Sequence, residues 1–438
     1  MKKTIIPLSI FFVAIVIFGF VAYTTPNILP YDLVDILRTI RDAGQEISKS
    51  TERSAGVPLK AKIFDSEFIV KEFVTGLRQP TTMTFVGDDI LILEKNTGNI
   101  KLIRDGTLAS EPIVDFEVGS TNESGLLGIT SKDNDVYVYV TEAEFDGGQT
   151  IGNNIYSFTW NGENLINKKL INTLSSESSW HNGGVLTVNS DGQVFAVIGD
   201  QMGGGRPDLK NDFRILQNVQ NGEIDDTGII VKVGFEEGII QPKLSQTPLD
   251  HYYAIAIRNS FGIAIDPLTG NIWDSENRPD HTDEINFVAE NFNSGWSVVM
   301  GPATNEQISQ IPPLGDFQYS DPEFSWERTV TPTGLEFFNS DVFPKYKGDL
   351  LVASCNFGQL FKFNLNDERT GFEFNSKHLQ DLVANYVETD GKKDFESMDE
   401  ILFGEGFGCL TDVEFGPDGN LYLVSLTDNA IYQVLPQD

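Results

Sequence analysis

The segment Ser179-Trp180-His181-Asn182-Gly183-Gly184 carries the histidine best placed for chemistry in this chain of 438 residues. An imidazole titrates near neutral pH, so His181 could take a proton from a hydroxyl group. Gly183 and Gly184 lack side chains and would let a ligand approach the backbone closely. Taken by itself, His181 fits a structural histidine as well as it fits a general base.

A second segment, Arg258-Asn259-Ser260-Phe261-Gly262, begins with an unusually placed arginine. Arg258 directly follows the apolar run Ile255-Ala256-Ile257. A guanidinium next to a buried strand needs an acidic partner or a ligand that compensates its charge. Alone, Arg258 fits an ion pair as well as a ligand contact. A histidine and an arginine of this kind on one repeated scaffold suggest an enzyme.

A short β-like unit that recurs six times along the chain would position both segments. Each unit has a turn with Gly or Asp followed by a strand of alternating apolar residues. Turns such as Asp191-Gly192 and Pro417-Asp418-Gly419 supply the positive φ that tight hairpins require. The units begin near Gly76, Gly125, Gly183, Arg258, Thr333 and Cys409. Units of about four strands without a 3.6-residue apolar period predict an all-β fold, a six-bladed β-propeller.

The first 23 residues predict a membrane-spanning helix or a signal segment ahead of the propeller. The run from Ile5 to Tyr23 has no charge and approaches the ~20 residues that cross a bilayer. Two lysines before it favour a cytoplasmic N-terminus, and cleavage near Val21-Ala22 is the alternative. We expect residues 1–23 to be the anchor or signal peptide, residues 24–65 a polar spacer and residues 66–438 the propeller.

The composition narrows the possible partners. A formal net charge of -33 argues against nucleic acid, because phosphate binding needs a basic face, and it fits a soluble exported domain. The only cysteines are Cys355 and Cys409, so no disulfide framework holds the fold. The remaining histidines, His251, His281 and His378, lack the spacing of a zinc site.

A series of short motifs runs in order along most of the chain. They are Glu123–Gly128, Trp180–Gly184, Arg258-Asn259 with Gly262, Ser275–Pro279, Asp283–Asn286, Asn293–Trp296, Pro332–Phe337, Asp412-Val413 and Gly416–Gly419. From about residue 70 to the C-terminus the chain thereby resembles the soluble PQQ-dependent aldose sugar dehydrogenases, also called the glucose/sorbosone dehydrogenase family.

The resemblance implies a six-bladed propeller that holds PQQ over its central axis, with a Ca²⁺ ion that polarises the quinone. It makes His181 the general base, which removes the sugar hydroxyl proton as hydride passes to PQQ. It places Arg258 near the quinone oxygens, where it would stabilise developing negative charge. Asn259 and Glu123 are the expected contacts to the cofactor.

The resemblance also implies metal ligands. Arg278 and Pro279 would give backbone carbonyl oxygens to the PQQ-linked Ca²⁺, and Glu284 would serve a second, structural Ca²⁺. Oxygen ligands of this kind are the ones that Ca²⁺ prefers. Arg278 stands where the family has Gly, and its side chain is a candidate partner for a PQQ carboxylate.

Three positions depart from the family pattern. PQQ carries three carboxylates, which the family pairs with the positive charges of one Lys and two Arg. The matching positions hold Asn356, Cys409 and Thr411, of which Asn356 and Thr411 remain cofactor-binding candidates. A charge-assisted hydrogen bond contributes about 1.5–3 kcal/mol, so these losses weaken PQQ binding unless other groups compensate. Cys355 and Cys409 fit either a disulfide near the axis or two small buried thiols.

Three functional hypotheses follow. The first is PQQ-dependent oxidation of an aldose or related sugar alcohol outside the cell, with electrons passed to a membrane acceptor. The second is a non-catalytic propeller that binds glycan or protein. The third is a Ca²⁺-dependent hydrolase of lactones or esters that uses carboxylates such as Glu123. We expect the propeller on the extracytoplasmic side, membrane-anchored or secreted.

Overall fold

The computed structural model describes residues 60–201, 226–234, 248–279, 281–389 and 392–437. Residues Leu59–Asp438 form one compact unit, which begins before the predicted boundary at residue 66. The predicted anchor (1–23) and the predicted spacer (24–65) up to residue 59 lie outside the described residues. None of the helices in the described ranges combines the length and apolar character that spanning a bilayer requires.

The strands form where short apolar runs alternate with tight turns. β13 (Val194–Ile198) and β30 (Leu421–Ser425) are buried along their whole length, because sheets cover both of their faces. The predicted turns precede these strands, and their glycines adopt the expected left-handed conformation: φ is 86° at Gly192 and 78° at Gly419.

Six sheets of four or more strands and one two-stranded sheet are formed by the described residues. Sheet 1 contains β3 (Pro80–Val86), β4 (Asp89–Glu94), β5 (Asn99–Arg104), β6 (Thr107–Leu108) and β7 (Val114–Asp115). Sheet 2 contains β8 (Leu126–Lys132), β9 (Asp135–Ala143), β10 (Thr150–Trp160) and β11 (Leu165–Leu174). Sheet 3 contains β12 (Leu186–Val188), β13, β14 (Ile229–Val233), β15 (Tyr252–Ile255), β19 (Phe292–Asn293) and β20 (Gln318–Tyr319).

The second half of the chain builds the other sheets. Sheet 4 contains β16 (Ser260–Ile265), β17 (Ile272–Glu276), β18 (His281–Val288), β21 (Phe324–Arg328) and β25 (Val383–Ala384). Sheet 5 contains β22 (Pro332–Phe337), β23 (Leu350–Ser354), β24 (Leu360–Phe363), β28 (Leu402–Glu405) and β1 (Lys62–Ile63). Sheet 6 contains β29 (Leu410–Phe415), β30, β31 (Ala430–Pro436) and β2 (Phe68–Thr75), and the small sheet pairs β26 (Tyr386–Thr389) with β27 (Lys392–Phe395). The helices among the described residues are α4 (Asn305–Gln310) and the 3₁₀ segments Pro248–His251 and Pro344–Tyr346.

One edge strand of each large sheet, which we call its inner strand, faces the centre of a closed ring. The strands β3, β8, β12, β16, β22 and β29 are neighbours in this order, and β29 returns to β3. The Thr82 hydroxyl donates to the Leu127 carbonyl (3.1 Å), and the Thr333 hydroxyl donates to the Leu410 carbonyl (2.9 Å). These hydrogen bonds join residues near the N-terminal ends of neighbouring inner strands. The inner strands therefore all begin at the same end of the ring, which we call the mouth. The predicted all-β propeller arrangement is confirmed, and the predicted repeat starts lie at or near the beginnings of the inner strands.

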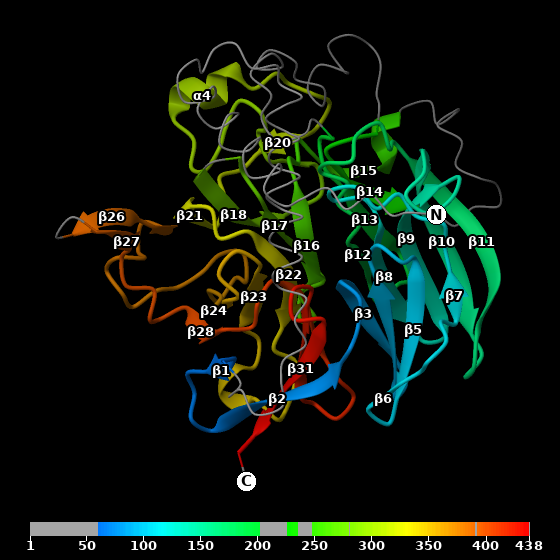
Figure 1. The fold of residues 1–438 in the computed structure, drawn as a ribbon. Helices are drawn as coiled ribbons and strands as arrows, with labels where there is room; N and C mark the ends of the chain where they lie inside the picture. Colours follow the sequence, from blue (N-terminus) through cyan, green and yellow to red (C-terminus); the bar gives the residue numbers. More distant parts are fainter. Residues whose placement is uncertain (1–59, 202–225, 235–247, 280, 390–391, 438) are drawn as a thin grey trace, which may run out of the picture. The chain divides into compact units, whose positions relative to one another are not determined.

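The two ends of the described chain close the ring. β2 pairs with β31 along its length, so an early strand becomes the outer strand of the last sheet (Figure 1). β1 also belongs to a distant sheet, because Lys62 pairs with Glu405 of β28 in the ladder and in a 3.0 Å ion pair. A two-residue strand such as β1 has no recognisable sequence pattern, so it could not be expected from the sequence.

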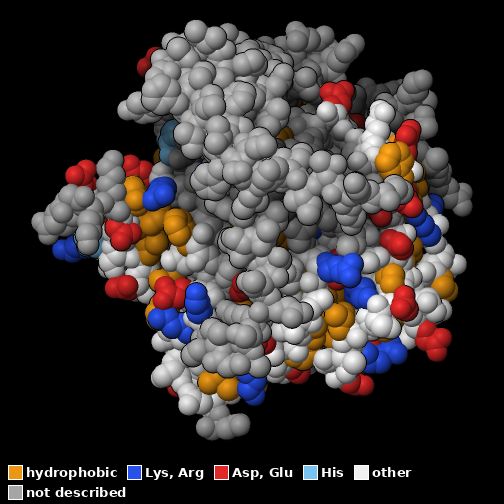
Figure 2. All heavy atoms as spheres, in the orientation of Figure 1, with side chains coloured by type: hydrophobic (Ala, Val, Ile, Leu, Met, Phe, Trp, Pro, Cys, Tyr) orange, Lys and Arg blue, Asp and Glu red, His pale blue; other side chains and the backbone are white. Residues whose placement is uncertain are grey.

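Apolar side chains fill the space between neighbouring sheets. Each pair of neighbouring sheets encloses its own cluster of buried residues, and the cluster between sheets 4 and 5 includes Trp273, Trp326 and Phe363. The described part of the surface in Figure 2 mixes acidic and basic side chains without an extended basic area. That no nucleic acid binds this chain stays a prediction.

Candidate functional site

His181 lies at the mouth, in the loop before β12, and its imidazole is held by an acidic partner. The ring atom Nδ1 lies 2.5 Å from Oδ1 of Asp200, and both side chains are almost fully buried. Because a carboxylate can only accept, Nδ1 carries the proton in this pair, and the Nε2 lone pair remains available for an incoming proton. A buried histidine held in this way has the orientation that a general base requires.

Asp200 is itself fixed from two sides. Its second oxygen, Oδ2, accepts a hydrogen bond from the Trp296 indole (2.7 Å), and its backbone N–H donates to the Arg258 carbonyl (2.8 Å). A Cβ atom on the neighbouring Gly199 would lie 2.5 Å from the Arg258 carbonyl oxygen and 2.7 Å from that of His181. The backbones of the two predicted catalytic residues, His181 and Arg258, therefore both pack against Gly199.

The loop that carries His181 is strained and tightly packed. His181 has φ 55°, a left-handed conformation that is uncommon for a residue with a side chain. Its backbone N–H donates to the Glu123 carboxylate (2.6 Å). Gly183 and Gly184 serve packing rather than ligand access: a Cβ atom would lie 2.4 Å from the Val197 carbonyl oxygen at Gly183 and 2.4 Å from the Leu127 side chain at Gly184. This corrects the role predicted for the glycine pair.

Glu123 and Asn259 also lie at the mouth. The Asn259 amide nitrogen is 3.4 Å from each oxygen of the Glu123 carboxylate. The Asn259 oxygen Oδ1 is buried and has no hydrogen-bond partner among the described residues. A buried acceptor without a partner is costly, so this atom is suited to a ligand that donates a hydrogen bond.

Arg258 is buried beside the histidine pair. Its Nη1 donates to the Asn277 carbonyl (2.5 Å), while Nε has no hydrogen-bond partner in the described chain. Its guanidinium carbon lies 5.4 Å from the centre of the Trp296 ring. Burial lowers the pKa of the Arg258 guanidinium, and the nearby Asp200 carboxylate opposes this shift. Arg258 thus offers a buried positive charge with an unused donor.

Arg278 lies 5.6 Å from the centre of the Trp296 ring, in a cluster of buried charges. Its guanidinium pairs with Glu284 (2.6 Å) and Glu276 (3.1 Å), and the three side chains are almost inaccessible. Burial disfavours the charged guanidinium, but the attraction of Glu276 and Glu284 outweighs it and raises the Arg278 pKa. Burial raises the pKa of Glu284 to about 7, although Arg278 opposes this rise. The acidic partners engage the Arg278 guanidinium, while its Nε has no hydrogen-bond partner among the described residues, and the hypothesis that this side chain meets a PQQ carboxylate stays a prediction.

The neighbouring Asp283 and Pro279 complete this part of the site. Asp283 accepts backbone hydrogen bonds from Arg278, Val330 and Thr331. Burial raises the pKa of Asp283 to about 6, although those hydrogen bonds lower it. Pro279 is partly buried. Within the described residues, no group of three or more His, Cys, Asp or Glu side chains is arranged to hold a metal ion.

The positions that depart from the family pattern lie at the beginning of sheet 6 and beside it. Cys355 and Cys409 form a disulfide, which decides between the two alternatives left open by the sequence. Asn356 is exposed, and its amide reaches the Thr329 carbonyl at 3.5 Å. The Thr411 hydroxyl turns to the Pro80 carbonyl (3.3 Å). These side chains add no positive charge to the mouth.

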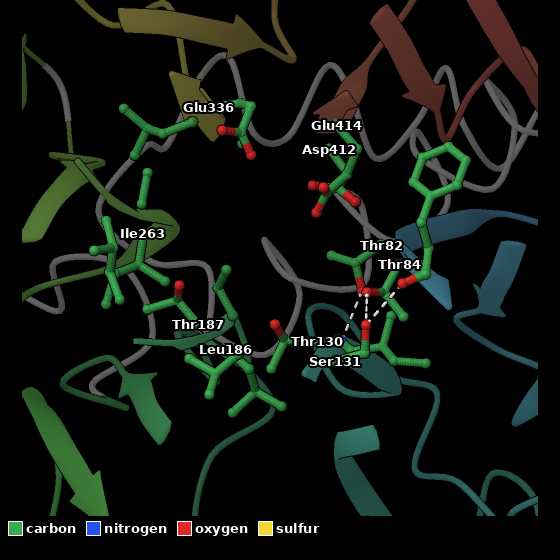
Figure 3. Close-up of a pocket in the computed structure, with 18 of the residues that line it drawn as sticks. Thr82, Thr84, Thr130, Ser131, Leu186, Thr187, Ile263, Glu336, Asp412 and Glu414 are labelled. Atoms are coloured by element: carbon green, nitrogen blue, oxygen red, sulfur yellow. Dashed lines mark hydrogen bonds between the residues drawn. The ribbon is translucent and has the colours of Figure 1, made fainter. Parts of the chain in front are cut away.

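A cavity of about 300 Å³ lies further along the inner strands. Figure 3 shows the carboxylates of Glu336, Asp412 and Glu414 pointing into it. The hydroxyl groups that line it belong to Thr82, Thr84, Thr130, Ser131 and Thr187. His181 and Arg258 do not line this cavity, so the predicted catalytic residues belong to the mouth.

The structure brings together His181, Arg258, Glu123 and Asn259, as predicted. Sequence reasoning missed Asp200, which follows β13 through Gly199. Because β13 runs antiparallel to β12, its far end returns to the mouth. The sequence signal was an acidic residue directly after an apolar strand of the unit that carries His181. Glu276 and Trp296 fell within recognised motifs but had no assigned role.

Comparisons with known proteins identify relatives of this chain. The aldose sugar dehydrogenase of Escherichia coli K12 is 26% identical over 262 residues, which cover 58% of this chain and 59% of that protein. Quinoprotein glucose dehydrogenase B of Acinetobacter calcoaceticus is 27% identical over 281 residues, which cover 56% of this chain and 57% of that protein. Either match spans less than two thirds of the relative.

A solved structure shares the fold. The PQQ-bound aldose sugar dehydrogenase of Streptomyces coelicolor superimposes with a TM-score of 0.58 at 20% identity, over 85% of this chain and 99% of that one. At this identity the likeness shows the fold alone. Residues 77–433 match the family described as Glucose / Sorbosone dehydrogenase, and the match covers most of the chain. The chain therefore belongs to the glucose/sorbosone dehydrogenase family.

Proposed function

We propose that this protein is a PQQ-dependent dehydrogenase that oxidises a hydroxyl group of an aldose or related sugar on a six-bladed propeller. One observation carries the proposal: the buried His181–Asp200 pair lies beside Arg258, whose Nε has no described partner. A base and an anion-stabilising donor at one mouth are what oxidation of an alcohol requires. The family relationship, the closed ring of inner strands and the quinoprotein relative support the same conclusion.

The residues at the mouth fit an oxygen-rich cofactor such as PQQ. The unpartnered Arg258 Nε is a donor for a quinone or carboxylate oxygen, and the unpartnered Asn259 Oδ1 is an acceptor. When bound, PQQ would accept the hydride that leaves the sugar carbon. For the Ca²⁺ linked to PQQ, the backbone carbonyls of Arg278 and Pro279 are the proposed ligands.

The roles of the protein groups follow from their positions. His181 Nε2 would take the proton from the hydroxyl oxygen while a hydride leaves the carbon that bears this hydroxyl, so the alcohol loses two hydrogens and becomes a carbonyl. Asp200 holds the imidazole by its Nδ1 proton and would stabilise the imidazolium that forms. Arg258 would donate to the oxygen that gains negative charge.

We further propose that the propeller works on the extracytoplasmic side, anchored by residues 1–23 or secreted, and passes electrons to a membrane acceptor. The Cys355–Cys409 disulfide supports this location, because disulfides persist in oxidising compartments. The uncharged apolar segment near the N-terminus supports an anchor or a signal peptide.

The first test is binding of PQQ to the purified chain with Ca²⁺ present, followed by dye-linked oxidation of a panel of aldoses. We expect saturable PQQ binding and turnover that disappears in His181→Ala. His378→Ala is a matched control, because His378 is exposed and lies outside the motifs that form the mouth. Turnover that persists in His181→Ala would contradict the proposed base.

A specific observation favours a second candidate, a propeller that binds glycan or protein without catalysis. The side chains of Asn356, Cys409 and Thr411 provide no cation for the PQQ carboxylates. Absence of PQQ binding at micromolar concentration would favour this candidate. The hydrolase hypothesis stays a prediction; Glu123, which it invokes, accepts the His181 backbone N–H.

A further inference from the structure

We propose that the guanidinium of Arg278 is a built-in cation that takes the place of the structural metal ion at Glu284. Family resemblance predicted a second Ca²⁺ at this glutamate. The geometry instead points to a cage in which two buried carboxylates, those of Glu276 and Glu284, enclose a protein cation. The inference concerns the metal requirement of the fold and is independent of the proposed activity.

Every oxygen of the two carboxylates already has a donor. Glu284 Oε2 is 2.6 Å from Arg278 Nη2, and Glu284 Oε1 accepts the Gly301 backbone N–H at 2.5 Å. Glu276 Oε1 accepts the Arg258 backbone N–H at 2.7 Å and lies 3.1 Å from Arg278 Nη1. A metal ion would have to displace these donors before it could reach the oxygens.

A hydroxyl group completes the cage. The Ser294 Oγ atom accepts from Arg278 Nη2 at 2.9 Å and donates to Glu276 Oε2 at 2.6 Å. Arg278, Glu276, Glu284 and Ser294 are all buried, so the cage has no solvent to compensate its charges. In such a place the carboxylates need a partner of opposite charge, and a planar guanidinium supplies several donors at fixed angles.

The two buried carboxylates, those of Glu276 and Glu284, need a cation to compensate their negative charge. Removing one partner of a buried ion pair leaves the other charge without compensation, which is strongly destabilising. Glycine at position 278, as in the family, would remove this cation and leave the two carboxylates to be compensated by another one, such as Ca²⁺, which prefers oxygen ligands. Arginine and a metal ion are therefore alternative solutions to the same electrostatic problem, and this chain contains the arginine.

The cage also supports the mouth. Glu276 accepts the backbone N–H of Arg258, so it joins the buried cation to the proposed catalytic arginine. The Arg278 guanidinium carbon lies 5.6 Å from the centre of the Trp296 ring, and Trp296 in turn holds Asp200. Arg278 is accordingly a positioning residue, which acts on the mouth through Glu276 and Trp296.

The test compares the purified full chain with its variants in the absence of PQQ. Thermal unfolding is followed in EDTA and in millimolar CaCl₂, and Tb³⁺ luminescence reports a bound lanthanide, with Trp296 as the nearby sensitiser. We expect the wild-type midpoint to be the same in EDTA and CaCl₂, and Tb³⁺ emission to be weak. Arg278→Ala should unfold earlier in EDTA, regain stability as the Ca²⁺ concentration rises, and sensitise Tb³⁺.

Matched variants separate the cage from other effects. Arg328→Ala removes an exposed arginine and should leave the response to Ca²⁺ unchanged. Arg278→Ala combined with Glu284→Gln should lose the Ca²⁺ response again. The proposal would be overturned if EDTA lowered the unfolding midpoint of the wild-type protein, CaCl₂ restored it, and Glu284→Gln abolished this response to Ca²⁺. Glu284 would then be a metal ligand.

The outcome does not depend on whether every variant folds. If Arg278→Ala fails to fold in EDTA but folds in CaCl₂, the proposal is supported. If it folds and shows neither Ca²⁺ stabilisation nor Tb³⁺ emission, the idea that arginine and metal are interchangeable is refuted. If wild-type protein binds no PQQ while the Ca²⁺ results hold, only the proposed function fails.

Discussion

Replacing Glu336 by Gln is expected to make the protein more stable at alkaline pH. Burial raises the pKa of the Glu336 carboxyl from 4.5 to about 8; the Phe337 backbone N–H opposes this rise, and the Asp412 carboxylate adds to it. Burial also raises the pKa of Asp412 to about 7 and that of Glu414 well above its usual value. All three carboxylates face the cavity in Figure 3, so each one that ionises makes the others harder to ionise.

The sign of the pH dependence follows from the raised pKa. The folded protein keeps the Glu336 proton at pH values where the unfolded chain has released it. Its contribution to stability is therefore complete below about pH 4.5 and is lost as the pH rises through about 8. Each pKa unit corresponds to ~1.4 kcal/mol, which sets an upper limit of roughly 5 kcal/mol for this group. Because the carboxyl borders a cavity where solvent relaxes part of the penalty, we expect ~2–5 kcal/mol.

The assay is urea unfolding at pH 5 and pH 9, followed by tryptophan fluorescence. We expect the wild-type free energy of unfolding to fall between these pH values by more than that of Glu336→Gln. The glutamine keeps the oxygen that accepts the Phe337 N–H, so the two proteins should be similar at pH 5. Glu373→Gln, at an exposed position, serves as control. Parallel pH profiles for wild type and Glu336→Gln would refute the reasoning.

Three further outcomes are expected. Asp200→Asn should lower kcat by ~10- to 100-fold in the dye-linked assay, because it removes a charge-assisted hydrogen bond that holds His181; an unchanged kcat would rule out that role. Gly184→Ala should lower the free energy of unfolding by ~1–3 kcal/mol, because φ is 106° there and the added carbon meets a leucine side chain; equal urea midpoints would contradict this. Denatured, unreduced protein should show no reactive thiols, and replacing Cys355 and Cys409 by Ser should lower the free energy of unfolding by ~4 kcal/mol for a crosslink across a sequence separation of 54 residues; two reactive thiols would exclude the disulfide.

The sequence by itself determined the repeated β architecture and the family. Both can be recognised from local patterns, which are alternating apolar residues, turns with glycine at positions of positive φ, and motifs that keep their order along the chain. The linear sequence was enough to make His181 and Arg258 candidates, because a histidine in a glycine-flanked segment and an arginine after an apolar run are visible there; their catalytic roles came from the family resemblance and stay predictions. Asn259 and Glu123 followed from the motifs around them.

Only the tertiary structure decided how these residues are connected. Asp200 became the partner of His181 because an antiparallel strand returns it to the mouth. The Arg278 side chain has acidic neighbours on β17 and β18, so its guanidinium turns to them. The disulfide likewise required Cys355 and Cys409 to meet across neighbouring sheets. Partners of this kind are chosen by three-dimensional proximity and by the cost of burying an uncompensated charge, neither of which a linear sequence displays.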